Sequence, residues 1–320
     1  MRSLLRLDIT SLRAKAGLGL ITAVLLTAIV TVFSHAATPQ QITGLTPAIT
    51  TDALSPSIAR GAYLAKAAGC QGCHTDKAEG AIPFAGGRAL KTPFGTFYGP
   101  NITPDPQNGI GQWSLQDFTR ALRLGQRPDG AHYFPAFPYT SFTQISDNDV
   151  ADLWAYFKSL PPNKRANSAH EISFPFQFRF LVTIWQWLYF KPGAFEANPQ
   201  LSPEINRGAY LTNALGHCTE CHTPRNRLGA SRNDRFLAGG MGPEGKNVPN
   251  LTPARLKKQW NDAELNDFLS SGQTPDGDVP AEAMREVINN STGQLTKEDL
   301  KALIAYLRSL PALPEEKKEK

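Results

Sequence analysis

The sequence predicts an all-α protein, a tandem repeat of two copies of one helical domain joined by an aromatic-rich linker. Three observations support this prediction. Residues 54–64 recur at 201–211 with nine of eleven positions identical, each copy closes with an amphipathic helix, and an aromatic segment separates the copies. Self-similarity of this kind indicates a duplicated structural unit, because equal sequences favour equal local structure.

Helix signals mark both ends of each copy. The repeated segment begins with Ser-Pro, which places a hydroxyl acceptor at the N-cap and proline at the first helical position. The closing helices, expected at 146–160 and 296–310, begin with Ser-x-x-Asp or Thr-x-x-Asp, carry apolar residues on one face and stop at proline. We therefore expect one domain at residues 50–163 and a second at 200–313. The interdomain linker covers 164–199, and a charged tail covers 314–320.

The composition indicates a globular protein that does not bind nucleic acid. Charged residues make up 19% and apolar residues 41% of the 320, which excludes disordered and polytopic membrane proteins. The formal charge is +5, but four of the basic residues precede residue 16 with one acid among them. The remainder of the chain is close to neutral, so we expect no basic surface for a phosphate backbone.

The N-terminal segment predicts export. Residues 16–33 carry no charge, basic residues precede them, and the Ser-His-Ala that follows resembles a small-residue cleavage site. The uncharged run is also at the lower limit of the length that spans a bilayer. Residues 1–36 are therefore interpreted as a signal peptide or as an uncleaved N-terminal membrane anchor. Both interpretations place the rest of the chain in the periplasm, the second one attached to the inner membrane.

The four cysteines fall in two identical patterns. They occur as C-x-x-C-H at 70–74 and 218–222, which is the attachment signature of c-type haem. In such a site two thiols bind the porphyrin covalently and the adjacent imidazole reaches the iron. A zinc site would bring the cysteine pairs together, and a redox dithiol does not need the histidine. The sequence predicts two covalently bound haem c groups, held by Cys70, Cys73, His74, Cys218, Cys221 and His222.

With these motifs the chain resembles class I cytochromes c. More closely, it is similar to the cytochrome c subunits of membrane-associated quinoprotein alcohol dehydrogenases and of molybdenum-containing aldehyde or N-heterocycle dehydrogenases. The resemblance is carried by Arg-Gly-Ala-Tyr-Leu before each haem motif, Cys-His-Thr-Pro-Arg-Asn at 221–226, Pro-Asn-Ile-Thr at 100–103 and Pro-Ala-Phe-Pro-Tyr at 135–139. It implies two class I cytochrome c domains, in each of which a loop between the first and last helices brings the sixth iron ligand.

The candidate sixth ligands differ between the copies. Met284 lies in the loop of the second copy that should lead back to the haem, and a Met/His iron suits electron transfer. Phe137 stands at the matching position of the first copy and cannot bind iron. His132, in the same loop, is the nearest nitrogen donor. An open iron, or another ligand such as Tyr133 or His170, remains an alternative.

The resemblance also implies polar contacts to the haem propionates. Groups around the ligands tune a metal centre as well as the ligands do. Tryptophan, asparagine and arginine side chains can donate hydrogen bonds to a carboxylate. The candidates are Trp113, Trp260, Asn101, Asn250, Arg88 and Arg225.

An aromatic segment dominates the linker. Residues 174–190 hold eight aromatic side chains and a single charge, at Arg179. The segment is too short to span a membrane. Two interpretations are open: a strap packed across the two domains, or a partly exposed patch that docks a dehydrogenase or the membrane surface.

These features predict an electron-transfer subunit. It would accept electrons from a periplasmic dehydrogenase and pass them to quinone, a cytochrome or a terminal oxidase, in association with the membrane. The chain has no Rossmann or P-loop glycine pattern. The alternative is a haem enzyme, a peroxidase or a thiosulfate-type oxidoreductase, that uses an open or unusually ligated first haem. Against it, a peroxidase needs a distal acid–base group, and the loop around Phe137 offers only His132, aromatic residues and prolines.

Overall fold

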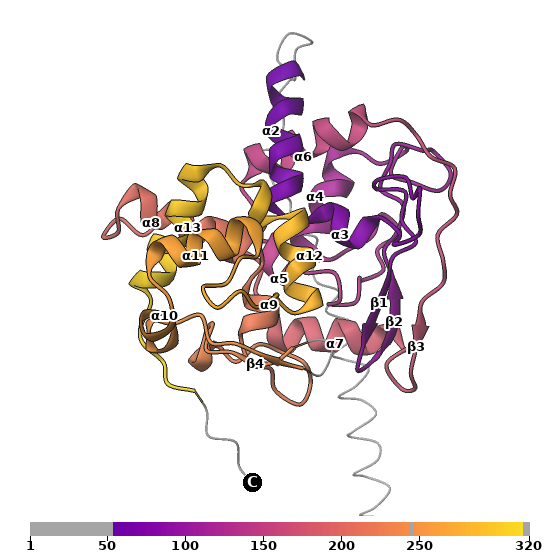
Figure 1. Ribbon diagram of the computed structural model, residues 1–320. Coiled ribbons are helices and arrows are strands. Elements are labelled where there is room, and N and C mark those ends of the chain that lie inside the picture. The colour runs from indigo at the N-terminus through magenta and orange to yellow at the C-terminus, as the bar shows by residue number, and fades with distance from the viewer. Residues whose placement is uncertain (1–53, 243–245, 316–320) are drawn as a thin grey trace, which may run out of the picture. The chain divides into compact units, whose positions relative to one another are not determined.

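The computed structural model describes residues 54–242 and 246–315 (Figure 1). The predicted signal peptide or anchor at 1–36 lies outside the described residues, as does most of the charged tail. Among the residues that are described, no helix combines the length and the apolar character needed to cross a bilayer.

Helices form the framework around both haem motifs. The first copy contains α2 (Leu54–Ala67), α3 (Cys70–His74), α4 (Leu115–Leu124), α5 (Tyr139–Phe142) and α6 (Asp147–Ser159). The second contains α8 (Pro203–Tyr210), the π-helix η2 (Leu211–Leu215), α9 (Thr219–His222), the 3-10 helix η3 (Asn233–Arg235), α10 (Pro253–Gln259), α11 (Asp262–Ser271), α12 (Glu282–Asn290), the 3-10 helix η4 (Thr292–Gln294) and α13 (Lys297–Ser309). Between the copies lies α7 (Arg179–Tyr189).

The closing helices begin and end where the sequence predicts. The hydroxyl oxygens of Ser146 and Thr296 accept hydrogen bonds from the backbone N–H of Asp149 and Asp299, three residues further on. Such caps stabilise a helix by about 1 kcal/mol each. Ser202 caps α8 in the same way. In the first copy, α2 already begins at Leu54, before the repeated Ser-Pro.

The prediction of an all-α fold is wrong. An antiparallel sheet in the order β1-β2-β3 joins β1 (Ala89–Thr92), β2 (Gly95–Tyr98) and β3 (Glu171–Ile172), and a smaller sheet pairs β4 (Gly240–Met241) with β5 (Asn247–Val248). Gly95 turns the first hairpin at φ 131° and is followed by the strand-favouring Thr-Phe-Tyr. Strands of two to four residues are too short for an alternating pattern to show in the sequence.

The prediction of a tandem repeat joined by an aromatic-rich linker is also wrong as a description of the architecture. The contacts group both copies into one compact unit, residues 49–320. Tyr210, Leu211 and Leu215 of the second copy belong to the same apolar cluster as the core of the first. The expected linker contributes β3 to the first sheet and α7 to its apolar face. Shared burial of apolar surface, rather than a connecting segment, holds the copies together.

Two tyrosines of the repeated segment join the copies reciprocally. Tyr63 of α2 donates a hydrogen bond to Asp299 of α13 at 2.6 Å, and its oxygen accepts one from the N-cap N–H of that helix. Tyr210 of α8 bonds in the same way to Asp149 and to the N-cap N–H of α6. Each tyrosine therefore supports the start of the other copy's closing helix.

The first and last helices of each copy cross at a glycine. A Cβ on Gly61 would lie 1.9 Å from the carbonyl oxygen of Asp152 in α6, and one on Gly208 would lie 1.9 Å from that of Ala302 in α13. Only a residue without a Cβ allows so close an approach of two backbones. This explains the glycine in the repeated Arg-Gly-Ala-Tyr-Leu.

We expect Gly208→Ala to separate α8 from α13 and to lower the free energy of unfolding by about 1–3 kcal/mol or more, as overpacking of a tight contact does. Chemical denaturation of the full chain, followed by far-ultraviolet circular dichroism, measures the change. Gly193→Ala is the matched control, because a Cβ there meets no atom within 4 Å. Equal stabilities of the two variants would contradict the assignment of the crossing to Gly208.

Candidate functional site

Each haem motif forms a short helix that ends at its histidine. The first motif is α3, and the second is α9 with Cys218 at its N-cap. Residues three and four apart share one side of a helix, so Cys73 and His74 lie on the same side as Cys70. Cys70, Cys73 and Cys218 take part in no disulfide bond, so their sulfur atoms are available for attachment to a porphyrin.

The imidazoles of the two motifs are held in matching positions. Nδ1 of His74 lies 2.8 Å from the carbonyl oxygen of Pro100, and Nδ1 of His222 lies 2.8 Å from that of Pro249. A carbonyl only accepts hydrogen bonds, so Nδ1 carries the proton and Nε2 keeps its lone pair for a metal. Desolvation lowers the pKa of both imidazoles, that of His222 to about 4. Both are therefore neutral, as an iron ligand must be.

A cavity of about 900 Å³ lies beside the first motif. Cys70, Cys73 and His74 line it, together with Trp113 and Phe97 and further apolar side chains. Cofactor sites are concave and largely apolar, with a few polar groups that fix orientation. The volume, the apolar walls and the cysteine–histidine set therefore fit a covalently bound haem.

The first-copy loop supplies walls to this cavity. Phe137, the residue opposite Met284 in the repeat, lines it and packs against Phe142 with ring centroids 5.7 Å apart. Tyr133 and His170 also line it. The Nδ1 of His170 accepts a hydrogen bond from the Tyr98 N–H at 3.1 Å, so the proton of the neutral ring is on Nε2, which can donate a hydrogen bond but has no free lone pair for a metal.

His132 lies next to Tyr133 but is not itself among the residues that line the cavity. Its Nδ1 is buried and has no hydrogen-bond partner among the described residues. Its backbone carbonyl accepts a hydrogen bond from Arg179 at 2.9 Å, and burial lowers the pKa of its imidazole. A buried imidazole nitrogen without a partner is unfavourable unless another group binds it. The structure therefore leaves this imidazole nitrogen without a partner among the described residues, but it does not place His132 in the wall of the cavity.

His217 borders the first cavity although it belongs to the second motif, and sequence reasoning missed it. It directly precedes Cys218, where the first copy has Gly69, and it shares a positive φ with that glycine, 38° against 61°. Its ring packs against Phe142 with centroids 5.5 Å apart, and it lines the first cavity. The substitution of histidine for glycine at matching positions of a repeat was the available signal.

Met284 lies in α12, half-buried against the core of the second copy. Cys218 packs against the same apolar cluster, so the fold brings the predicted methionine ligand and the second motif to one core. Trp260 joins this cluster and packs on Phe268 with ring centroids 4.7 Å apart. Its partner in the repeat, Trp113, faces the first cavity.

The two asparagines predicted to contact propionates hydrogen-bond to the backbone. Asn101 donates from Nδ2 to the carbonyl of Asn163, and Asn250 donates to that of Leu313, both at 2.7 Å. Their Oδ1 atoms accept from the backbone two residues on. These bonds fasten the segment after each closing helix, and Asn101 lines the cavity as well.

The two predicted arginines are engaged in ion pairs. Arg88 pairs with Glu286 of α12 at 2.7 Å, and Arg225 pairs with Glu220. Neither lines the first cavity, whereas Arg127 and Arg179 do. Sequence reasoning missed these two cations of the cavity wall. Arg127 pairs with Asp129 at 3.0 Å, and Arg179 donates to the carbonyl of His132 at 2.9 Å.

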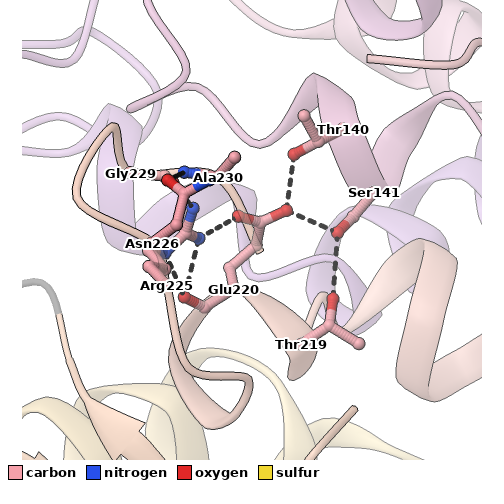
Figure 2. A network of polar contacts seen from close by, with 8 residues as sticks. All are labelled: Thr140, Ser141, Thr219, Glu220, Arg225, Asn226, Gly229 and Ala230. Carbon is pink, nitrogen blue, oxygen red and sulfur yellow. Dashed lines mark hydrogen bonds and ion pairs between the residues drawn. The ribbon is translucent and has the colours of Figure 1, made fainter. Parts of the chain in front are cut away.

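Glu220 links the second motif to α5 of the first copy, as Figure 2 shows. Its carboxylate pairs with Arg225 and accepts hydrogen bonds from Thr140 at 2.6 Å and from Ser141 at 2.8 Å, both in α5. Burial raises the pKa of this carboxyl, but Arg225 and the two hydroxyls outweigh it, and the pKa is lowered. An ionised, fully satisfied carboxylate therefore joins the two copies.

Comparison with known proteins agrees with the two haem motifs. The cytochrome c family model matches twice, at residues 58–161 and 205–311. A diheme cytochrome c-type protein of Cereibacter sphaeroides is 44% identical over 264 residues, which cover 81% of this chain and 88% of the relative. A nicotinate dehydrogenase subunit of Pseudomonas putida is 43% identical over 80% of this chain and 21% of its own length.

The alcohol dehydrogenase (quinone) cytochrome c subunit of Gluconobacter oxydans is 38% identical over 83% of this chain and 57% of its own length. The chain thus spans about a fifth of the length of the nicotinate dehydrogenase subunit and somewhat over half of the length of the alcohol dehydrogenase subunit. The two family matches each contain one C-x-x-C-H motif with its carbonyl-bound imidazole. The chain therefore belongs to the cytochrome c family, and it carries two covalently bound haem c groups.

Proposed function

We propose that this protein is a periplasmic, membrane-associated electron-transfer subunit. It accepts electrons from a dehydrogenase and passes them to quinone, a cytochrome or a terminal oxidase. The main observation behind this proposal occurs twice in the chain. A neutral imidazole stands at the end of each C-x-x-C-H helix, and a proline carbonyl 2.8 Å away holds it in place. Relatives named as cytochrome subunits of dehydrogenases support the choice of donor.

The chain has two haem-binding halves, residues 50–163 and 200–313, and each half binds one haem. Each haem c supplies a one-electron redox centre when bound. The cysteines of each motif fix the group, and the histidine, oriented by its carbonyl partner, ligates the iron. Met284 is the sixth ligand in the second half. Residues 1–36 direct export, as a cleaved signal or as an anchor.

The function is tested with the purified full chain. Both haems should be reduced by dithionite and reoxidised by ferricyanide reversibly, as followed by the visible absorbance bands. We expect no oxidation of alcohols or aldehydes by the chain alone, because the relatives are named as cytochrome subunits of dehydrogenases, which leaves substrate oxidation to a partner. Substrate turnover by the isolated chain would overturn the proposal. The alternative of a haem peroxidase or thiosulfate-type enzyme finds no support among the relatives named above.

His132 is the proposed sixth ligand of the first haem, because its buried Nδ1 has no hydrogen-bond partner among the described residues. We expect His132→Ala to convert the first haem from low-spin to high-spin in low-temperature electron paramagnetic resonance, and to allow the reduced form to bind carbon monoxide. His170→Ala is the control, since the Nδ1 of His170 already accepts a hydrogen bond. Since the second haem, with His222 and Met284, gives a low-spin signal in every variant, only the signal of the first haem decides. A low-spin signal of the first haem that survives in His132→Ala, or carbon monoxide binding by the first haem of the wild type, would contradict this assignment.

A further inference from the structure

The segment around α7 exposes an unusual amount of apolar surface. Eight of the large apolar side chains that are exposed in the described structure fall between residues 174 and 189. Trp187 is 83% exposed and Phe174 is 76% exposed. Monomeric proteins rarely leave a contiguous patch of this kind in water, and such patches mark interaction sites.

The polarity of α7 is reversed relative to an ordinary surface helix. Its buried positions are Val182 and Gln186, one turn apart, and the amide of Gln186 is directed at the carbonyl of Leu124. Its outer positions include Phe180, Ile184 and Trp187. A helix that only covered the protein would point glutamine outward and the apolar residues inward. The outer face of α7 is therefore suited to an apolar medium.

The segment is fixed to the fold, so the exposure is not that of a loose strap. Val182 packs with Phe97 and Phe134. The indole N–H of Trp185 donates to the carbonyl of Leu228 at 2.8 Å. The ring of Phe176 packs on Phe94 with centroids 4.9 Å apart. Figure 1 shows α7 as a continuous helix beside the lower ends of β1 and β2.

The charges around the patch indicate what covers it. No acidic residue occurs from 172 to 195, whereas the exposed Arg179 and Lys191 stand at the two ends of α7. Tryptophan, tyrosine and phenylalanine flanked by basic side chains are typical of helices that lie in the lipid headgroup region. With eleven residues, α7 is too short to cross a bilayer.

We propose that α7 lies in the plane of an anionic lipid bilayer, with Phe180, Ile184, Trp187 and Leu188 at the boundary between headgroups and acyl chains. Lys191 contacts the lipid phosphates, and Arg179 adds to the positive potential at that surface. This inference specifies the membrane contact of the function proposed above, and it does not depend on which molecules exchange electrons with the protein.

The test places a reporter on the proposed lipid face. Thr183→Cys adds a thiol on the exposed side of α7 without removing an apolar group. Lys301→Cys, at a side chain 77% exposed on α13, is the matched control. Each full-length, haem-loaded variant is labelled with an environment-sensitive fluorophore. One label per chain, measured by mass, shows that the motif cysteines are occupied; additional labels would contradict haem attachment and not the lipid contact.

The labelled proteins are mixed with vesicles of phosphatidylcholine and phosphatidylglycerol. At position 183 we expect quenching by aqueous iodide to fall several-fold and quenching by lipids with acyl-chain nitroxides to rise. At position 301 iodide quenching should not change. Adding Trp187→Ser and Leu188→Ser to the Thr183→Cys chain should restore iodide quenching. Because residues 16–33 can hold the chain on vesicles by themselves, binding alone is not the readout.

Three results would overturn the proposal. One is equal iodide quenching at 183 and 301 on vesicles that retain the protein. Another is unchanged protection at 183 after the double serine substitution. The third is protection at 183 that appears only when a dehydrogenase is added, which would assign the patch to a protein partner.

Discussion

The double variant Cys70→Ala, Cys73→Ala is expected to retain one covalent haem instead of two. Without thiols at the first motif, His74 alone cannot hold the porphyrin when non-covalent material is removed with acid. The mass of the acid-treated chain should therefore fall by one haem, and the reduced α-band absorbance per chain should fall by about half, one of the two chromophores being lost.

Met241→Leu is the control for this experiment, because Met241 is 62% exposed and stands outside both motifs. It should keep two haems. The same experiment on Cys218 and Cys221 should leave the other haem in place. A double variant that still carries two covalent haems would refute the assignment of the first motif, and a wild-type mass equal to the bare chain would refute both.

Glu220→Ala is expected to lower the free energy of unfolding substantially. The side chain of Glu220 is 14% exposed, and its removal leaves Arg225, Thr140 and Ser141 without their shared acceptor. Breaking a buried ion pair in this way costs about 3–5 kcal/mol. Denaturant unfolding at neutral pH measures the loss.

A surface pair provides the matched comparison for Glu220. Glu282, 75% exposed, pairs with Lys77 at 2.9 Å, and Glu282→Ala should change the free energy of unfolding much less than Glu220→Ala does, because water screens an exposed pair. The folded-state pKa of Glu220 is lowered, so its contribution is present above the ordinary pKa of glutamate and is lost as the pH falls through the folded value. The difference in the free energy of unfolding between wild type and Glu220→Ala should therefore become smaller at acidic pH. Equal losses for both alanine variants at neutral pH would contradict the role assigned to Glu220.

The arginine predictions show where sequence reasoning reaches its limit. The family resemblance implies propionate contacts for Arg88 and Arg225, and the structure shows each of them in an ion pair with a carboxylate, Glu286 or Glu220, that no motif indicated. A long, flexible side chain takes the partner that the fold brings within reach, and such partners are not encoded by a motif. Arg127 and Arg179 reach the first cavity for the same reason.

The short strands and the joining of the copies were missed for a related reason. The sequence pattern of β3 covers two residues, and its partner β2 lies more than seventy residues earlier. Tyr63 and Tyr210 belong to the repeat that suggested separate domains, but their hydroxyls bond to the opposite copy. A repeat shows that two units are alike, and it does not show whether they bury surface against each other.

The sequence by itself determined the local chemistry: the two C-x-x-C-H motifs, the capped closing helices and the duplication, since each depends on residues a few positions apart. Only the tertiary structure decided that the copies share one core, that His217 borders the first cavity while Glu220 bonds to α5, and that the aromatic segment turns its apolar face outward. These features depend on contacts between residues tens to hundreds of positions apart, which the free energy of the whole fold selects and no local pattern encodes.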